Sequence, residues 1–129
     1  EGDEETRRKI NAKGYQRAMQ RIMSMVPQAD VIVTNPTHVA VALKYDRENM
    51  SAPIVLAKGK GFLAQRIREI ARKAGVPILE RKPLARALYE SVQVGSTIPH
   101  DLFKAVAEVL AYVYRLKNPY AYANRQGGA

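Results

Sequence analysis

The feature that most constrains the fold is a pair of strand-forming runs separated by four residues. Residues 31–34 read VIVT and residues 39–45 read VAVALKY, and both are rich in residues that favour strands. The second run also alternates between two faces, which is the period of a strand. The connection between the runs consists of Asn35, Pro36, Thr37 and His38. So short a connection predicts an antiparallel hairpin, although tight hairpins usually turn on Asn-Gly or Asp-Gly.

The next part of the chain predicts two more strands with a helix between them. Residues 54–58 form the third strand, which we expect Gly59 and Gly61 to break, and residues 76–79 form the fourth. The helix has an apolar stripe at amphipathic spacing, and Gly75 is a favourable end for it. The stripe consists of Leu63, Ile67, Ile70, Ala71 and Ala74. A strand–helix–strand order predicts a right-handed parallel crossover.

Three further helices complete the prediction. The first covers residues 1–26 and ends at Pro27; its apolar positions are Tyr15, Ala18, Met19, Ile22, Met23 and Val26. Pro83 begins a short helix over PLARALY, and Pro99 begins the last. The inward positions of the last helix are Leu102, Val106, Val109, Leu110 and Val113. We therefore expect an α/β fold, a small mixed sheet of about four strands surrounded by about four helices, with an extended N-terminal helix.

Composition narrows the chemistry that such a fold can perform. The 129-residue chain has no cysteine, which excludes disulfides and thiolate sites, and its two histidines make a His-rich metal site improbable. No apolar run approaches the roughly 18–20 residues that span a bilayer. A net charge of +9 favours acidic partners such as nucleic acid, anionic lipid or acidic protein faces. We expect no metal and no cofactor.

The Asn35–Pro36 bond permits two interpretations. The simpler one is a type I turn, in which Asn at the first position and Pro at the second are favoured and the Asn side chain caps its own turn. The other starts from what proline removes. Because Pro36 has no N–H, the usual attack of the next main-chain nitrogen on the Asn side chain is blocked. The Asn35 side-chain nitrogen is left free to attack its own main-chain carbonyl carbon and break the chain.

This cyclisation needs help from its surroundings, because an amide is a poor nucleophile. A tight turn between paired strands holds the reacting atoms together. The hydroxyls of Thr34 and Thr37, with main-chain N–H groups, are candidates to stabilise the oxyanion. His38 is the natural proton carrier, because histidine is the residue type whose unperturbed pKa lies near neutrality. The alternative for His38 is a strand histidine that faces solvent. A cut at a hairpin tip leaves the flanking strands paired, so the fragments should stay together.

At these residues the sequence resembles the cytoplasmic domain of the FlhB/YscU family, the self-cleaving specificity switch of type III protein export. The resemblance extends from Tyr15 to Lys117. Beyond ADVIVTNPTHVAVALKYD, it is carried by the segments APIVLAKGKG, GVPILERKPLARALY, VGSTIP and AVAEVLAYVYRLK. The segment from KYD to MSAPIVLAKGKG resembles the flagellar branch; the alternative is an injectisome homologue.

The resemblance implies a division of the chain and a set of partners. Residues 1–26 correspond to a basic linker helix that follows transmembrane helices outside this chain, residues 27–117 to the switch domain, and residues 118–129 to a loose tail. The family is cleaved between the residues that match Asn35 and Pro36. Its function implies a change of export from rod and hook subunits to filament-type subunits, prompted by a hook-length ruler protein beside an export-gate membrane protein. The implied location is the cytoplasmic face of the bacterial inner membrane.

Two other surfaces have candidate roles. The loop residues Ala52 and Pro53 have no obvious core duty, and together with Ala107 and Leu110 they form a candidate apolar dock for an extended export signal. The alternative is that the loop only makes a turn and that Leu110 belongs to the core. A basic linker helix near a membrane is a candidate for anionic lipid contact, through Arg7, Arg8, Lys9, Lys13 and Arg17. The alternative for such charge runs is a solvated surface.

Two other function classes compete with a self-cleaving switch. A nucleic-acid-binding module would explain the positive charge, but the basic residues are not interleaved with aromatic residues and no nucleic-acid motif is present. A multiple-turnover hydrolase would need a Ser/His/Asp or Cys/His set, paired carboxylates or metal ligands, and the sequence shows none of these. We therefore expect a single-turnover reaction of the chain on its own backbone, no enzyme in the ordinary sense, and no nucleic-acid partner.

Overall fold

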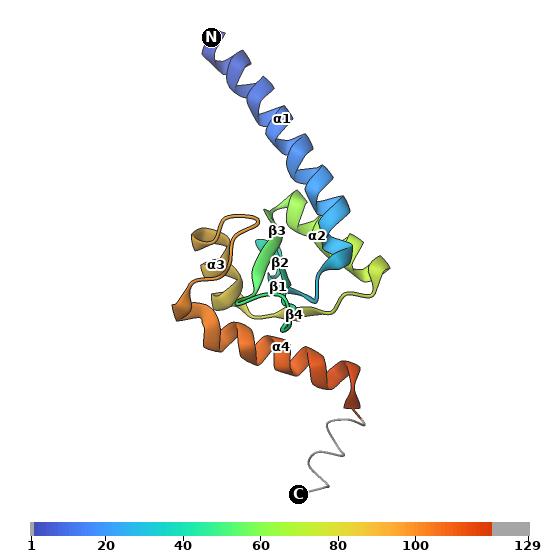
Figure 1. Ribbon diagram of the computed structural model, residues 1–129. Coiled ribbons are helices and arrows are strands. Elements are labelled where there is room, and N and C mark those ends of the chain that lie inside the picture. The colour runs from blue at the N-terminus through green and yellow to red at the C-terminus, as the bar shows by residue number, and fades with distance from the viewer. Residues whose placement is uncertain (1, 120–129) are drawn as a thin grey trace, which may run out of the picture.

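The structure, a computed structural model, describes residues 2–119, with side chains from residue 12 onward. A long helix leads into a four-stranded sheet flanked by three more helices (Figure 1). The elements are α1 (Gly2–Met25), η1 (Val26–Gln28), β1 (Val31–Asn35), β2 (Val39–Lys44), β3 (Ile54–Lys60), α2 (Phe62–Ala74), β4 (Ile78–Glu80), α3 (Lys82–Ser91), η2 (His100–Leu102) and α4 (Phe103–Lys117). The predicted α/β fold with its N-terminal helix is confirmed. Most of the expected tail, residues 120–129, lies outside the described residues.

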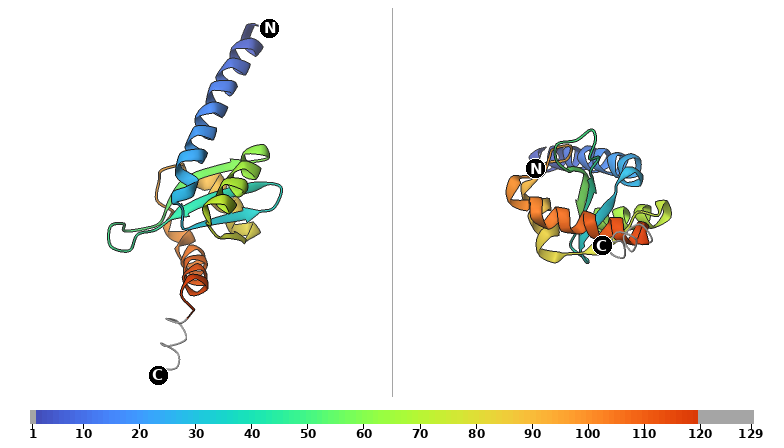
Figure 2. Two further views of the ribbon diagram at one scale, coloured as in Figure 1. Left: turned by 90° about the vertical axis from the view of Figure 1, so that its right-hand side faces the viewer. Right: turned by 60° about the horizontal axis from the view of Figure 1, so that its bottom comes forward.

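The sheet has the order β3-β2-β1-β4. β2 is antiparallel to both β1 and β3, while β4 pairs in parallel with β1. The strands β1, β3 and β4 therefore run in one direction and end at the same edge of the sheet. The predicted parallel crossover from β3 through α2 to β4 spans the full width of the sheet, so its two strands are not neighbours. The hairpin tip after β1 lies at this shared edge, and the loop between β2 and β3 lies at the opposite end (Figure 2).

Both faces of the sheet are covered, so its central strands are buried on both sides. On one face Val31, Val33 and Val41 pack with α3 and α4. On the other face Ile32 and Ala42 pack with the end of α1 and with α2. α1 projects away from the sheet, and α4 crosses the opposite side of the domain (Figures 1 and 2). The alternation along β1 thus assigns odd-numbered residues to the α3 and α4 side.

Two predicted strand boundaries are wrong. β3 does not break at Gly59 but continues to Lys60, with Gly59 opposite Ala40. A Cβ on Gly59 would lie 2.7 Å from the Cβ of Leu63, so the glycine allows close packing against α2 rather than ending the strand. β4 begins at Ile78 instead of Val76. The N–H of Val76 is already used by the carbonyl of Ala71 at the end of α2, where Gly75 has the predicted left-handed conformation.

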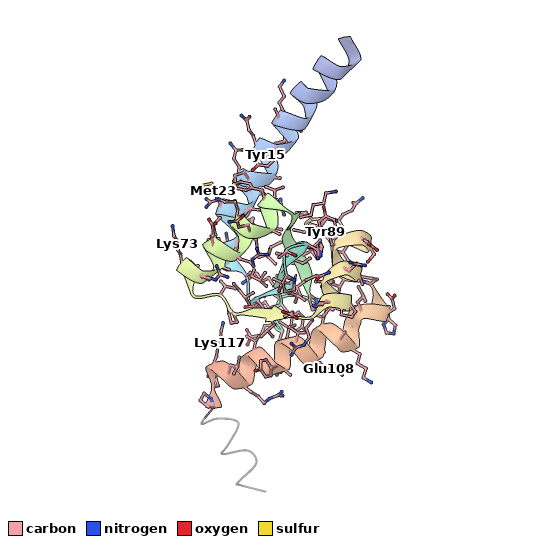
Figure 3. All side chains as sticks on the ribbon, turned by 180° about the vertical axis from the view of Figure 1, so that it is seen from behind. Tyr15, Met23, Lys73, Tyr89, Glu108 and Lys117 are labelled. Carbon is pink, nitrogen blue, oxygen red and sulfur yellow. The ribbon has the colours of Figure 1, made fainter. Side chains whose placement is uncertain are left out.

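The apolar stripe of α1 is only partly buried. Ile22 and Val26 are buried as predicted, but Met23 is 56% exposed, and Met25 packs against the core instead. Tyr15, which is labelled in Figure 3, is 42% exposed. It stacks on Phe62 of α2, with 6.3 Å between ring centroids. The buried part of the helix is therefore confined to its last two turns. Within residues 2–119 no helix combines the length and the apolar character that crossing a membrane would take.

Candidate functional site

The Asn-Pro-Thr-His turn joins the two central strands of the sheet. Asn35 is the last residue of β1, faces Val39 of β2, and is 7% exposed. Pro36 is half-buried, whereas Thr37 and His38 are exposed. Because β1 is bonded to β4 on its other side and β2 is bonded to β3, both ends of the turn are fixed in ladders of the sheet. A turn held on both sides in this way keeps the atoms of Asn35 and Pro36 in one geometry.

The backbone of the turn has one unusual residue. Thr37 has φ of +66°, and the residue before it in the turn is Pro36. Proline at the second position and a positive φ at the third match a type II turn, which ordinarily places Gly or Asn at the third position. A non-glycine residue in this region costs on the order of 1–3 kcal/mol. The type I turn that Asn-Pro favours is therefore not the one that forms.

The carbonyl oxygen of Asn35 accepts a hydrogen bond within the turn. The donor is the main-chain N–H of His38, with 3.0 Å between nitrogen and oxygen. If the Asn35 side chain attacks this carbonyl, negative charge develops on the same oxygen, and a donor already in place stabilises it. The carbonyl of His38 in turn accepts from the N–H of Gly61, also at 3.0 Å. The junction between β3 and α2 thus holds the turn from its far side.

The Thr34 side chain lies away from that of Asn35. The Thr34 hydroxyl donates to the carbonyl of Leu79 at 3.4 Å, and strand alternation puts it on the face opposite to the Asn35 side chain. The Thr34 carbonyl accepts from the N–H of Arg81 at 3.0 Å. In this conformation Thr34 ties β1 to β4, and the group that donates to the Asn35 carbonyl is the main-chain N–H of His38. Sequence reasoning named main-chain N–H groups only in general, because turn type decides which one is placed.

The four predicted docking residues lie together in one groove. Ala52 and Pro53 come from the loop, Ala107 and Leu110 come from α4, and the groove has a volume of about 770 Å³. Its lining also includes Arg47, Phe103, Tyr114 and Lys117, which the sequence reasoning missed. The signal was present, since residues 103, 107, 110 and 114 repeat at helical spacing on a second face of α4. The lining of the groove is mostly apolar, and its charged members are the basic Arg47, Arg115 and Lys117 and the acidic Asp30.

The loop that forms one wall of this groove is closed by Asp46. Its carboxylate accepts from the Asn49 side chain at 2.6 Å and from the N–H of Glu48 at 3.0 Å. The bond from Asn49, followed by the bond from Glu48, lowers the pKa of Asp46 below its ordinary value. Because this pKa is lowered on folding, the carboxylate's contribution to loop order is present at neutral pH and is lost as the pH falls through the lowered pKa.

The part of the chain that the structure describes contains no group of three or more His, Asp or Glu residues able to hold a metal ion.

Sequence comparison identifies a family over most of the chain. Residues 1–113 match the model of the FlhB HrpN YscU SpaS family. The flagellar biosynthetic protein FlhB of Bacillus subtilis is 51% identical over 117 residues, covering 91% of this chain and 32% of that protein. The flagellar biosynthetic protein FlhB of Salmonella typhimurium is 56% identical over 117 residues, covering 91% of this chain and 30% of that protein. The chain thus spans about a third of the length of these relatives.

Solved structures agree with the sequence comparison. The cytoplasmic domain of FlhB from Shewanella putrefaciens has a TM-score of 0.74 at 50% identity, with 78% of each chain covered. An EscU C-terminal domain with an Asn-to-Ala substitution has a TM-score of 0.69 at 33% identity, covering 71% of this chain and 92% of that one. At these identities the likeness concerns relatives and not the fold alone.

Proposed function

The chain belongs to the FlhB HrpN YscU SpaS family, and from this premise we propose that it is the cytoplasmic part of a flagellar protein export component that cleaves itself between Asn35 and Pro36. The flagellar relatives favour this branch over the injectisome alternative. A variant EscU domain with the Asn substitution and another with a Pro substitution at the next position show that this relative also has an Asn-Pro pair. The observation that carries the proposal is the Asn35 carbonyl, held by the His38 N–H in a turn between central strands.

The proposed reaction is a cyclisation of Asn35. Its side-chain nitrogen forms a bond to its own main-chain carbonyl carbon, and the bond from that carbon to the nitrogen of Pro36 breaks. The side-chain nitrogen loses one proton and the Pro36 nitrogen gains one, a transfer that we assign to His38. The products are a C-terminal succinimide and a free proline amine. Each chain reacts once, so the domain is not a turnover enzyme.

The fold supports a switch rather than a digestion. After the cut, β1 remains paired with β2 and β4, and residues on both sides of the cut share the core cluster under α3. The fragments therefore stay associated while the tip is released. We propose that this release changes export from rod and hook subunits to filament-type subunits in response to a hook-length ruler protein. The proposed setting is beside the export-gate protein at the cytoplasmic face of the inner membrane, with the domain tethered by transmembrane helices outside this chain.

The groove between the loop and α4 is the proposed dock for early export subunits. Its apolar lining suits an extended apolar segment, and Arg47 and Lys117 in the same lining suit acidic flanks.

The helix α1 is the proposed lipid contact. Lys13 and Arg17 are exposed on α1 near the exposed aromatic pair of Tyr15 and Phe62, a combination that favours an anionic interface. The side chains of Arg7, Arg8 and Lys9 lie outside the described residues.

A denaturing gel with N-terminal sequencing tests the proposed cleavage. The expected result is two fragments, residues 1–35 and residues 36–129, with the second starting at Pro36. Under native conditions the two fragments should elute as one species.

For the lipid proposal, neutralising the five basic residues from Arg7 to Arg17 should reduce co-sedimentation with anionic vesicles at low salt. Unchanged co-sedimentation would exclude that contact.

A further inference from the structure

We infer that Thr37 is a positioning residue that stores backbone strain in the uncleaved turn and thereby favours opening of the Asn35–Pro36 bond. This inference rests on the proposed self-cleavage and gives Thr37 a role separate from its hydroxyl. Among residues 2–119, Thr37 is the one non-glycine residue with a positive φ. A β-branched residue is an outlier in this region, because its crowded Cβ approaches the neighbouring carbonyl.

The strain persists because the uncleaved turn is fixed at both ends. On the side of Asn35, β1 is paired with β2 and with β4, and the adjacent Thr34 carbonyl is bonded to the N–H of Arg81. On the other side, the carbonyl of His38 is bonded to the N–H of Gly61 at 3.0 Å, and β2 is paired with β3. With only Pro36 and Thr37 between these anchors, and the φ of Pro36 set by its ring, the positive φ is left to Thr37.

Cleavage removes one of the two anchors. When the carbon of Asn35 gains its bond to the side-chain nitrogen and loses its bond to Pro36, Pro36 and Thr37 become the first two residues of a new N-terminus. His38 is still held by Gly61, but φ of Thr37 can return to the usual negative region. The strain is therefore present before the cut and absent after it. Its release favours the products and begins in the transition state, as the scissile bond lengthens.

Three substitutions separate strain from the hydroxyl. Thr37→Asn and Thr37→Gly both accept a positive φ, so they relieve the strain, and both lack the hydroxyl. Thr37→Val also lacks the hydroxyl but keeps the β-branched Cβ, so it retains the strain. If strain matters, the valine variant is faster than the other two. If only the hydroxyl matters, all three variants are equally slow.

The rate experiment uses the full chain made in a short cell-free translation pulse, so that cleavage is followed from its start. The fraction of intact chain is measured on denaturing gels over time. We expect Thr37→Asn and Thr37→Gly to cleave about fivefold or more slowly than Thr37→Val. Because strain involves no titrating group, this ratio should be the same at every pH at which the domain is folded. Equal rates for the three variants, or a slower Thr37→Val, would overturn the inference.

A stability measurement provides a second readout that does not depend on the rate. In the uncleavable Asn35→Ala chain, adding Thr37→Asn should raise the melting temperature by about 4 °C or more, since relief of strain stabilises the intact turn. In the cleaved pair, obtained after complete reaction, the same substitution should leave the melting temperature unchanged. Equal shifts in the two forms would show an ordinary surface effect and would contradict stored strain.

The proposed cyclisation of Asn35 and the proposed strain at Thr37 can be tested separately. If Asn35→Ala is cleaved at the same bond, the proposed cyclisation is wrong, whatever the Thr37 series shows. If Asn35→Ala stays intact while the three Thr37 variants share one rate, the cyclisation stands and only the strain inference is lost.

Discussion

The main-chain N–H of His38 donates to the carbonyl oxygen of Asn35, with 3.0 Å between the two atoms. His38 thus contributes twice to the proposed reaction, through its main chain on the oxyanion and through its imidazole on the protons. The first contribution depends on the turn and not on the side chain. The two contributions can therefore be separated by substitution.

Replacing the imidazole tests its role as proton carrier. His38→Ala keeps the main-chain donor on Asn35 but loses the acid and base group, so we expect cleavage to slow by about 10²- to 10⁴-fold. The measurement is the half-time of the intact chain on denaturing gels. His100→Ala is the matched control, because His100 is exposed at the start of η2 and its ring lies tilted against that of Phe103, so this variant should cleave at the rate of the unaltered chain. A rate for His38→Ala close to that of the control would exclude the imidazole from the reaction.

The close approach of β3 to α2 predicts an intolerant glycine. In the Asn35→Ala background, Gly59→Ala places a Cβ 2.7 Å from that of Leu63, and we expect a loss of about 1–3 kcal/mol from the free energy of unfolding. Gly14→Ala is the control, since nothing lies within 4 Å of the added Cβ on α1 and alanine is the better helix former. Denaturant titration gives both values. A Gly59→Ala domain as stable as its parent would contradict the tight packing described for this junction.

Lys58 links β3 to the end of α3. Its ammonium donates to the carbonyls of Tyr89 and Val92, at 2.7 and 2.8 Å, and lies 5.0 Å from the centre of the Tyr89 ring. Lys58→Met keeps the aliphatic stem and removes these contacts, so thermal unfolding in the Asn35→Ala background should show a loss of about 1–3 kcal/mol. The matched control is Lys60→Met, at an exposed position on the same strand. Equal losses for the two variants would mean that the Lys58 contacts contribute nothing specific.

The groove along α4 predicts a charge-sensitive binding surface. Ala107 is exposed in the groove, so Ala107→Asp places a carboxylate on its apolar floor without opening the core. We expect at least a tenfold weaker affinity, on the order of 1–2 kcal/mol, for a peptide from a rod or hook subunit, the occupant proposed for this groove. Ala74→Asp, at an exposed alanine at the end of α2, is the control. Fluorescence titration of a labelled peptide that gives equal affinities for both variants would place the dock elsewhere.

Local patterns predicted most of the architecture. The stripe from Leu63 to Ala74 and the stop at Gly75 gave α2, and the two runs around Asn35 gave the hairpin. The positions that failed depend on tertiary contacts. Gly59 was expected to end β3 because nothing local reveals that Leu63 packs against it. Met23 and Met25 are chemically alike, and the angle at which α1 meets the sheet decides which of them packs against the core.

The candidate site was predictable in its composition and not in its geometry. The Asn-Pro-Thr-His motif named the reacting groups, yet the type I turn expected from Asn-Pro does not form, since the two central strands impose a positive φ on Thr37. The docking residues were named from two separate segments, and the fold brings them into one groove. Its aromatic members on α4, Phe103 and Tyr114, were missed because they fall outside the inward stripe predicted for that helix.

The most direct test of the account is the C-terminal chemistry of the fragment that ends at Asn35, measured by mass spectrometry on freshly cleaved protein and paired with Asn35→Ala. Cyclisation predicts a fragment lighter by one water than ordinary hydrolysis would give, and an alanine variant that stays intact. As that succinimide opens, isoasparagine should appear beside asparagine at the new C-terminus. Cleavage of Asn35→Ala between residues 35 and 36, or a fragment that ends only in asparagine from the earliest time, would contradict the account.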